Sequence, residues 1–210
     1  MNIAFVGAHH DDLELSCGGS IAAWAENGHK VYGMILTKSQ WTTPDGKLMG
    51  DFSKMCQEAE RASNILGYEP LNLGLSDDFD LKFKDEYVCE LLRIFDEKNI
   101  DTLITIWPHD AHPTHKVCSD IALAASRKIP RILLVKVSWN PATVAYKPCF
   151  FMDISSYYEQ KVAALRCFET EFQRVGDSWL TFVDADSKAR GLESNLARAE
   201  AFDLLRWIPE

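Results

Sequence analysis

Short apolar runs alternate with longer helical segments along most of the chain, and this alternation limits the folds that it can adopt. The runs NIAFVGA, KVYGMILT, PLNLGL, TLITIW and RILLVKV predict strands. Segments 20–29, 51–67, 85–99 and 113–127 predict helices between them. Strands separated by helices form βαβ units with a mostly parallel sheet. We therefore expect an α/β fold in which helices cover both faces of a doubly wound sheet.

The remaining segments extend this pattern to the end of the chain. CFFMDIS predicts a further strand, and helices are predicted near 155–168 and 190–206. The first helix is expected to open at Ser20 or at the preceding Gly18 and Gly19, and Gly28 and Gly67 stand where helix C-caps are expected. No repeat, low-complexity tract or linker divides the chain, so we expect a single domain over residues 1–210.

Composition excludes several classes of protein. With 47% hydrophobic residues the chain can bury a core, and its net charge of −9 argues against binding nucleic acid through phosphates. No apolar run approaches the roughly 18 residues of a membrane span, and the N-terminus lacks a signal-peptide pattern. The six cysteines form no CxxC pair, which is typical of reduced thiols, and we expect a cytoplasmic protein. The sequence is compatible with a homo-oligomer.

Two loops carry an unusual density of ionisable residues. AHHDD (8–12) follows the first predicted strand and PHDAHPTH (108–115) follows TLITIW. Ligands of such sheets bind beyond the carboxyl ends of the strands, where both loops lie. Imidazole and carboxylate groups suit Zn²⁺, with Fe²⁺, Co²⁺ or Ni²⁺ as substitutes. Either loop alone is as typical of a solvated turn or a helix N-cap, but together they favour a metal site. VGAHHDDLELSCGG lacks GxGxxG spacing, which disfavours a nucleotide-binding oxidoreductase.

The same loops carry a family resemblance. AHHDDLELSCGG resembles the AHPDDxExxxGG signature of the PIG-L/LmbE-like deacetylases, and HPTH resembles their HPDH signature. QEAERASNILG, LGLSD, FFMDIS with Lys161, and RGLESNLARAEAF are similar to further family segments, so the resemblance runs from residue 3 to about 205. It implies a Rossmann-like three-layer α/β/α zinc hydrolase that removes N-acetyl groups, most often from amino sugars.

The resemblance also implies roles for individual residues. By position in the two signatures, His9, Asp12 and His115 correspond to the metal ligands. Asp11 corresponds to the general base, and His112 to the histidine that assists the oxyanion or the leaving amine.

Two residues near these motifs each have two candidate roles. Asp110, included among the catalytic candidates, lies close enough in sequence to orient His112 or His115, and it is also a candidate N-cap for the helix that starts at Pro113. Glu14 either supports the site or is exposed.

The sequence departs from the family pattern in three segments. His10 replaces the proline of AHPDD without removing a ligand. Thr114 replaces the aspartate of HPDH, which puts the protonation of His112 in question unless Asp110 compensates. Lys54 and Met55 precede the helix glutamate where relatives often carry an arginine, so an arginine-dependent substrate contact does not transfer.

Substrate contacts are expected from loops at the same edge of the sheet. Trp41, in the loop 37–51, either stacks on a sugar ring or anchors the loop, and Trp139 and Asn140 are similar candidates. The leading hypothesis is N-deacetylation of a small amino sugar, with a nucleotide among the candidate carriers. The alternatives are deacylation of another small amide, such as a thiol conjugate, and a metal-stabilised binding protein without turnover.

Overall fold

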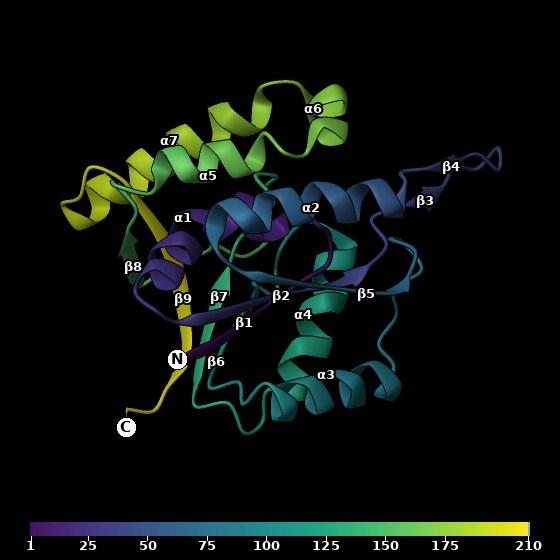
Figure 1. Cartoon of the computed structure of the whole chain (residues 1–210), viewed down its shortest axis with the longest axis horizontal. Helices are drawn as coiled ribbons and strands as arrows, with labels where there is room; N and C mark the ends of the chain where they lie inside the picture. Colours follow the sequence, from purple (N-terminus) through teal and green to yellow (C-terminus); the bar gives the residue numbers. More distant parts are fainter. Residues whose placement is uncertain (210) are drawn as a thin grey trace.

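A seven-stranded sheet forms the centre of the protein in the computed structural model, which describes residues 1–209 (Figure 1). The strands lie in the order β5-β2-β1-β6-β7-β9-β8. The first five in this order run parallel, whereas β9 runs antiparallel to both of its neighbours. The strands are β1 (Asn2–Gly7), β2 (Lys30–Thr37), β5 (Glu69–Ser76), β6 (Thr102–Ile106), β7 (Arg131–Val135), β8 (Phe150–Asp153) and β9 (Ala199–Trp207). A separate hairpin of β3 (Trp41–Thr42) and β4 (Leu48–Met49) projects from the body of the molecule (Figure 1).

Helices cover both faces of this sheet (Figure 1). One face carries α1 (Asp12–Glu26), α2 (Phe52–Leu66), α5 (Tyr158–Leu165), α6 (Glu169–Val175) and α7 (Ser178–Ser194). The other face carries α3 (Asp85–Glu97) and α4 (Pro113–Ala125). The predicted three-layer fold with a mostly parallel sheet is confirmed.

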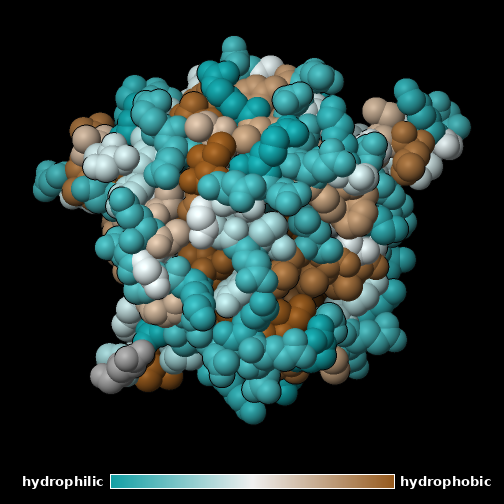
Figure 2. Space-filling model, in the orientation of Figure 1, coloured by the Kyte–Doolittle hydropathy of each residue, from teal (hydrophilic) through white to brown (hydrophobic). Residues whose placement is uncertain are grey.

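The middle strands are buried on both faces, as their apolar sequences predict. All five residues of β6 and of β7 are buried, and only Asn2 of β1 is not. Alternation is absent from these strands because helices cover them from both sides. The surface seen in Figure 2 is mostly hydrophilic, with hydrophobic side chains gathered near its middle and on the projecting hairpin, where Leu48 is exposed. Among residues 1–209 no helix is both long enough and apolar enough to cross a bilayer.

The predicted helix over 190–206 is wrong. Helix α7 ends at Ser194 in a left-handed Asn195, and the following segment is strand β9, inserted between β7 and β8. Its alanine, glutamate and leucine residues have high helix propensity, but its first half pairs with β8 and its second half with β7, so these strand partners decide its conformation. The short helix α6 was not predicted, since no periodic apolar pattern marks it.

Helix α1 begins earlier than predicted and is kinked. It starts at Asp12, not near Ser20, and the backbone leaves helical geometry at Cys17 before a second helical segment continues. The buried carboxylate of Glu200 accepts hydrogen bonds from the N–H groups of Gly19 (3.0 Å) and Ser20 (2.7 Å), which the kink leaves without helical partners. A side chain at Gly19 would collide with Ile154, so this glycine permits a close approach.

The strand order places a crevice between the ends of the adjacent strands β1 and β6. The chain moves outward from β1 to β2 and β5, then returns to add β6 and β7 on the other side of β1. Loops that leave β1 and β6 therefore diverge to opposite sides and leave space between them, which is where ligands bind in sheets of this kind. AHHDD and PHDAHPTH are the loops at this point.

Glu14 of α1 is a fully buried carboxyl group. Its Oε1 accepts a hydrogen bond from the hydroxyl of Tyr68 at 2.6 Å, and Oε2 has no hydrogen-bond partner within residues 1–209. Burial raises the pKa of Glu14 from 4.5 to about 8. Of the two roles considered for this residue, exposure is excluded.

We predict that Glu14→Gln makes the protein less sensitive to rising pH. The native carboxyl keeps its proton up to about pH 8 whereas the unfolded one ionises above 4.5, so wild-type stability falls as pH rises through this window. Glutamine does not ionise, so the stability difference should move in favour of the variant by about 2–4 kcal/mol between pH 5 and pH 8. Denaturant unfolding with a chelator present measures this, and a constant difference across the window would contradict it.

Candidate metal centre

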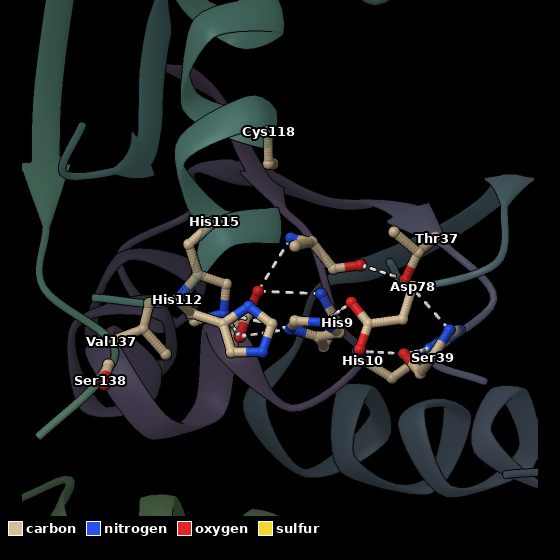
Figure 3. Close-up of polar contacts among 12 residues, drawn as sticks. His9, His10, Thr37, Ser39, Asp78, His112, His115, Cys118, Val137 and Ser138 are labelled. Carbon is tan, nitrogen blue, oxygen red and sulfur yellow. Dashed lines mark hydrogen bonds and ion pairs between the residues drawn. The ribbon is translucent and has the colours of Figure 1, made fainter. Parts of the chain in front are cut away.

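Side chains from the loops after β1 and β6 meet in the crevice. His9 and Asp12 come from the first loop and the start of α1, and His112 and His115 come from the start of α4. Figure 3 shows the three imidazoles gathered beside the start of α4. The two sequence motifs, a hundred residues apart, thus form one cluster.

Three donor atoms in this cluster face a common point. His9 Nδ1 lies 3.1 Å from His115 Nε2, which lies 3.2 Å from Asp12 Oδ1, and the third side of the triangle is 3.6 Å. Zinc bonds of about 2.0–2.2 Å in tetrahedral geometry place donors about 3.3–3.6 Å apart. The donor set and its spacing therefore fit a divalent cation with His9, Asp12 and His115 as ligands.

The carboxylate of Asp12 is held by the backbone of its own loop. Its Oδ2 accepts hydrogen bonds from the N–H groups of Ala8 and His9, both at 2.8 Å. The other oxygen, Oδ1, is thereby turned toward the two histidines. A side chain at Gly7 would meet Phe5 at 2.5 Å and Asp12 at 3.2 Å, so the loop needs glycine at this position.

A carboxylate also orients each histidine of the triangle. His115 Nδ1 lies 2.9 Å from Asp110 Oδ1, and His9 Nε2 lies 2.7 Å from Asp78 Oδ1. A neutral imidazole that donates through its outer nitrogen presents a lone pair on the inner one. Both inner nitrogens belong to the triangle.

The charges in the cluster attract positive charge. Burial lowers the pKa of His115, but Asp12 and Asp110 outweigh it and raise that pKa to about 9. Burial likewise opposes protonation of His9, yet Asp12 and Asp78 raise its pKa well above the usual value. The carboxylates thus stabilise a cation at this position, whether it is a proton on each ring or a metal ion that replaces them.

Asp110 connects three segments from a fully buried position. Besides His115, it accepts hydrogen bonds from the backbone N–H groups of His112 (2.9 Å), Val137 (3.3 Å) and Ser138 (2.9 Å). It orients the ring of His115 and contacts only the backbone of His112. It is therefore a positioning residue in this structure, and it does not compensate at the His112 ring for the aspartate that Thr114 replaces.

Asp11 and His112 line the cavity beside the triangle. Burial, then the charges of Glu171 and Asp12, raise the pKa of Asp11 to about 7. The ring of His112 lies 4.7 Å from that of His115 and stacks on Phe79, with 6.0 Å between centroids. Burial and its two imidazole neighbours lower the pKa of His112, so this ring favours the neutral form.

The cavity has a volume of about 330 Å³ and partly aromatic walls. Trp41, Trp139 and Asn140, the candidate substrate contacts, line it. The Trp41 ring meets the Phe79 ring edge to face at 6.4 Å on one side, and on the other Trp139 packs against Phe182 at 5.3 Å.

His10 and Thr114 lie outside the triangle. His10 is buried and turns away, with Nδ1 2.6 Å from Ser39 Oγ (Figure 3). Burial lowers its pKa to about 4. Thr114 is also buried, and its hydroxyl contributes to lowering the pKa of Asp78. The extra imidazole therefore supports the loop and does not join the cluster.

Sequence reasoning missed residues that reach the cavity from distant segments. Asp78 follows β5, two strands away from β1, and Glu171, Arg174 and Trp179 come from α6 and α7. The doubled aspartate after PLNLGLS was the only local signal for Asp78. No local pattern marked the other three.

The fold and the cluster define an α/β protein with a candidate divalent-cation site at the carboxyl edge of a parallel sheet. The family model described as PIG-L, GlcNAc-PI de-N-acetylase, matches residues 4–126. The chain belongs to this family.

Individual proteins are similar over nearly the whole chain. A diacetylchitobiose deacetylase of Thermococcus kodakarensis is 24% identical, over 96% of this chain and 80% of the relative. The crystal structure of an N,N'-diacetylchitobiose deacetylase from Pyrococcus horikoshii superposes with a TM-score of 0.83 at 20% identity, covering 97% of this chain and 83% of that one. A 4-carboxy-2-hydroxymuconate hydratase from Pseudomonas putida KT2440 superposes with a TM-score of 0.80 at 18% identity, covering 100% and 98%. The last two likenesses concern the fold alone.

We predict that Asp110→Asn destabilises the protein by about 2–3 kcal/mol, because one charged acceptor that serves four donors in a buried position is lost. Denaturant unfolding with a chelator present measures this without a contribution from bound metal. Asp77→Asn is a matched control, since Asp77 contacts Gln40 and Lys38 at a partly exposed position. Its cost should stay below about 1 kcal/mol. Equal costs for the two variants would contradict the role assigned to Asp110.

Proposed function

We propose that this protein is a zinc-dependent N-deacetylase that releases acetate from an N-acetylated amino sugar. The observation that carries the proposal is the triangle of His9 Nδ1, Asp12 Oδ1 and His115 Nε2, with each imidazole oriented by a carboxylate behind it. Membership of a family of de-N-acetylases supports the reaction. His9, Asp12 and His115 would hold the cation.

The cation and the chain have separate parts in this reaction. When bound, zinc supplies Lewis-acid chemistry, since it makes water nucleophilic near neutral pH and polarises a carbonyl group. Three protein ligands leave room for water and substrate at such an ion. Nitrogen and oxygen donors also bind Fe²⁺, Co²⁺ or Ni²⁺. Zinc is the metal that we propose, and these three are its substitutes.

Asp11 is the proposed general base and acid. It lies next to the ligand Asp12 but belongs to the cavity wall, so it can take the proton of the attacking water. Burial and the neighbouring carboxylates favour the protonated form once that proton has arrived. Asp11 can then pass it to the nitrogen of the leaving amine, which departs as a neutral group.

His112 is the proposed donor to the carbonyl oxygen. Because its pKa is lowered, we assign this role to a neutral imidazole N–H and not to an imidazolium. One well-placed donor of this kind stabilises the developing oxyanion by on the order of 3 kcal/mol. Stacking on Phe79 and contact with the His115 ring fix the plane of the imidazole.

The cavity walls favour a sugar as the group that carries the amide. Trp41 and Trp139 offer faces for the apolar side of a pyranose, and Asn140 adds a polar group. A relative that spans nearly this whole chain is named for deacetylation of an N-acetylated disaccharide. Acyl groups other than acetyl, and amides on a thiol conjugate, are the alternatives that a substrate panel separates.

Metal analysis and turnover test the proposal together. Protein purified without added metal should contain about one zinc per chain and release acetate from N-acetylated amino sugars. A chelator should abolish release and added zinc should restore it. Zinc with no acetate from any member of the panel would favour a binding protein without turnover. Neither zinc nor turnover would contradict the proposal as a whole.

We predict that Asp11→Asn lowers kcat by about 10²–10⁴-fold and leaves the zinc content unchanged, because only the proton acceptor is lost. His115→Ala should lose zinc and activity together. Asp120→Asn is the control, since Asp120 is exposed on α4 outside the cavity. Acetate release and elemental analysis on the same preparations give both values. An Asp11→Asn enzyme with parental kcat would exclude Asp11 as the base.

A further inference from the structure

Helix α6 brings a charged pair to the wall of the cavity. Glu171 and Arg174 both line it, and the guanidinium of Arg174 donates two hydrogen bonds to Glu171 Oε2, that from Nε at 2.8 Å. The Glu171 side chain is 12% exposed, whereas that of Arg174 is 57% exposed. The carboxylate therefore lies deep in the wall and its cationic partner lies at the rim.

A buried residue of α2 holds this helix in position. Glu58 is fully buried and its Oε1 accepts hydrogen bonds from the backbone N–H and the hydroxyl of Thr170, at 3.1 and 2.9 Å. The contact joins the start of α6 to α2, beside the cavity residue Met55. Glu171 follows Thr170 directly, so its placement in the wall is determined by packing.

The charges of the cavity are unevenly distributed. Asp11, Asp12, Asp78 and Glu171 contribute four carboxylates to the lining within residues 1–209, and Arg174 is the single lysine or arginine there. That arginine is paired with Glu171 through Nε and one terminal nitrogen. A divalent cation in the triangle would face Asp11 and Asp12, which leaves the part of the cavity near α6 without free positive charge.

We propose that Glu171 selects substrates whose sugar carries an uncharged group, and that it does so by accepting hydrogen bonds from hydroxyls and by repelling anionic carriers. The inference rests on the proposed deacetylase function. A phosphate or nucleotide next to the sugar would meet a carboxylate in a partly desolvated wall and an arginine that is already paired. A neutral oligosaccharide offers hydroxyl donors to the same carboxylate and an apolar ring face to Trp139, which also lines the cavity.

Two N-acetylated probes that differ in charge test this selectivity. The ratio of kcat/KM for N,N'-diacetylchitobiose to that for N-acetylglucosamine 1-phosphate should favour the neutral sugar in the wild type. In Glu171→Gln the ratio should fall about tenfold, because one negative charge is removed and Arg174 is released to bind the phosphate. The change in the ratio should lie mainly in KM, because the effect of the Glu171 charge on the pKa of Asp11 is common to both probes. The preference of the wild type for the neutral probe should also decrease at high salt.

Two further variants make the test specific. Glu169→Gln, on the same helix but with a 65% exposed side chain outside the cavity, should keep the wild-type ratio. Arg174→Gln changes an exposed side chain and should move the ratio in the opposite direction from Glu171→Gln. A wild-type preference for the phosphate-bearing probe, or the same ratio in Glu171→Gln and Glu169→Gln, would overturn the proposal.

Product binding separates this inference from the proposed function. Calorimetry with glucosamine and glucosamine 1-phosphate needs no turnover, and the wild type should bind the unphosphorylated amine more tightly, with the difference reduced in Glu171→Gln. If neither N-acetylated probe releases acetate while this pattern of binding holds, the deacetylase function fails and the charge selectivity stands. If acetate is released but neither product discrimination nor its loss is seen, the selectivity fails alone.

Discussion

The site depends on the hydrogen bonds that the backbone donates to the carboxylate of Asp12. Two N–H groups of the loop after β1 occupy one carboxylate oxygen, so only the other can face the histidines. The hydrogen bonds form because the chain turns sharply from β1 into α1, and Gly7 permits that turn by leaving room for Phe5 and Asp12. A buried carboxylate left without these donors would be costly to keep ionised. The loop therefore both stabilises the negative charge and aims it.

A second set of buried charges preserves the geometry at a distance. Lys161 and Glu200 form a buried ion pair at 2.6 Å, and Glu200 also serves the N–H groups exposed by the kink in α1. An ion pair with all partners satisfied is tolerated in the interior, whereas loss of one partner leaves an uncompensated charge. The kink divides α1 into two helical segments, and Glu200 holds the start of the second one. The C-terminal strand β9 thus supports the kinked helix α1 near the N-terminus.

The sequence was informative where a structural element depends on its own residues. Apolar runs such as TLITI in β6 predicted the buried strands, and the two polar loops predicted the cluster because parallel strands end at one edge. The segment 199–207 was misjudged because its propensity is helical while its partners are strands. Asp78 and Glu171 reach the cavity from segments that no local pattern connects with it, and such contacts depend on the whole fold.

The fold by itself does not determine the reaction. A hydratase and a deacetylase share this architecture with the present chain, so the chemistry must lie in the side chains around the crevice. In this chain the carboxylates at the crevice fall into two groups. Asp12, Asp78 and Asp110 are bound by backbone N–H groups or imidazoles and fix the donor triangle. Asp11 and Glu171 line the cavity, where a substrate would meet them. In the proposed reaction the first group would hold a cation, and the second would serve proton transfer and discrimination between carriers.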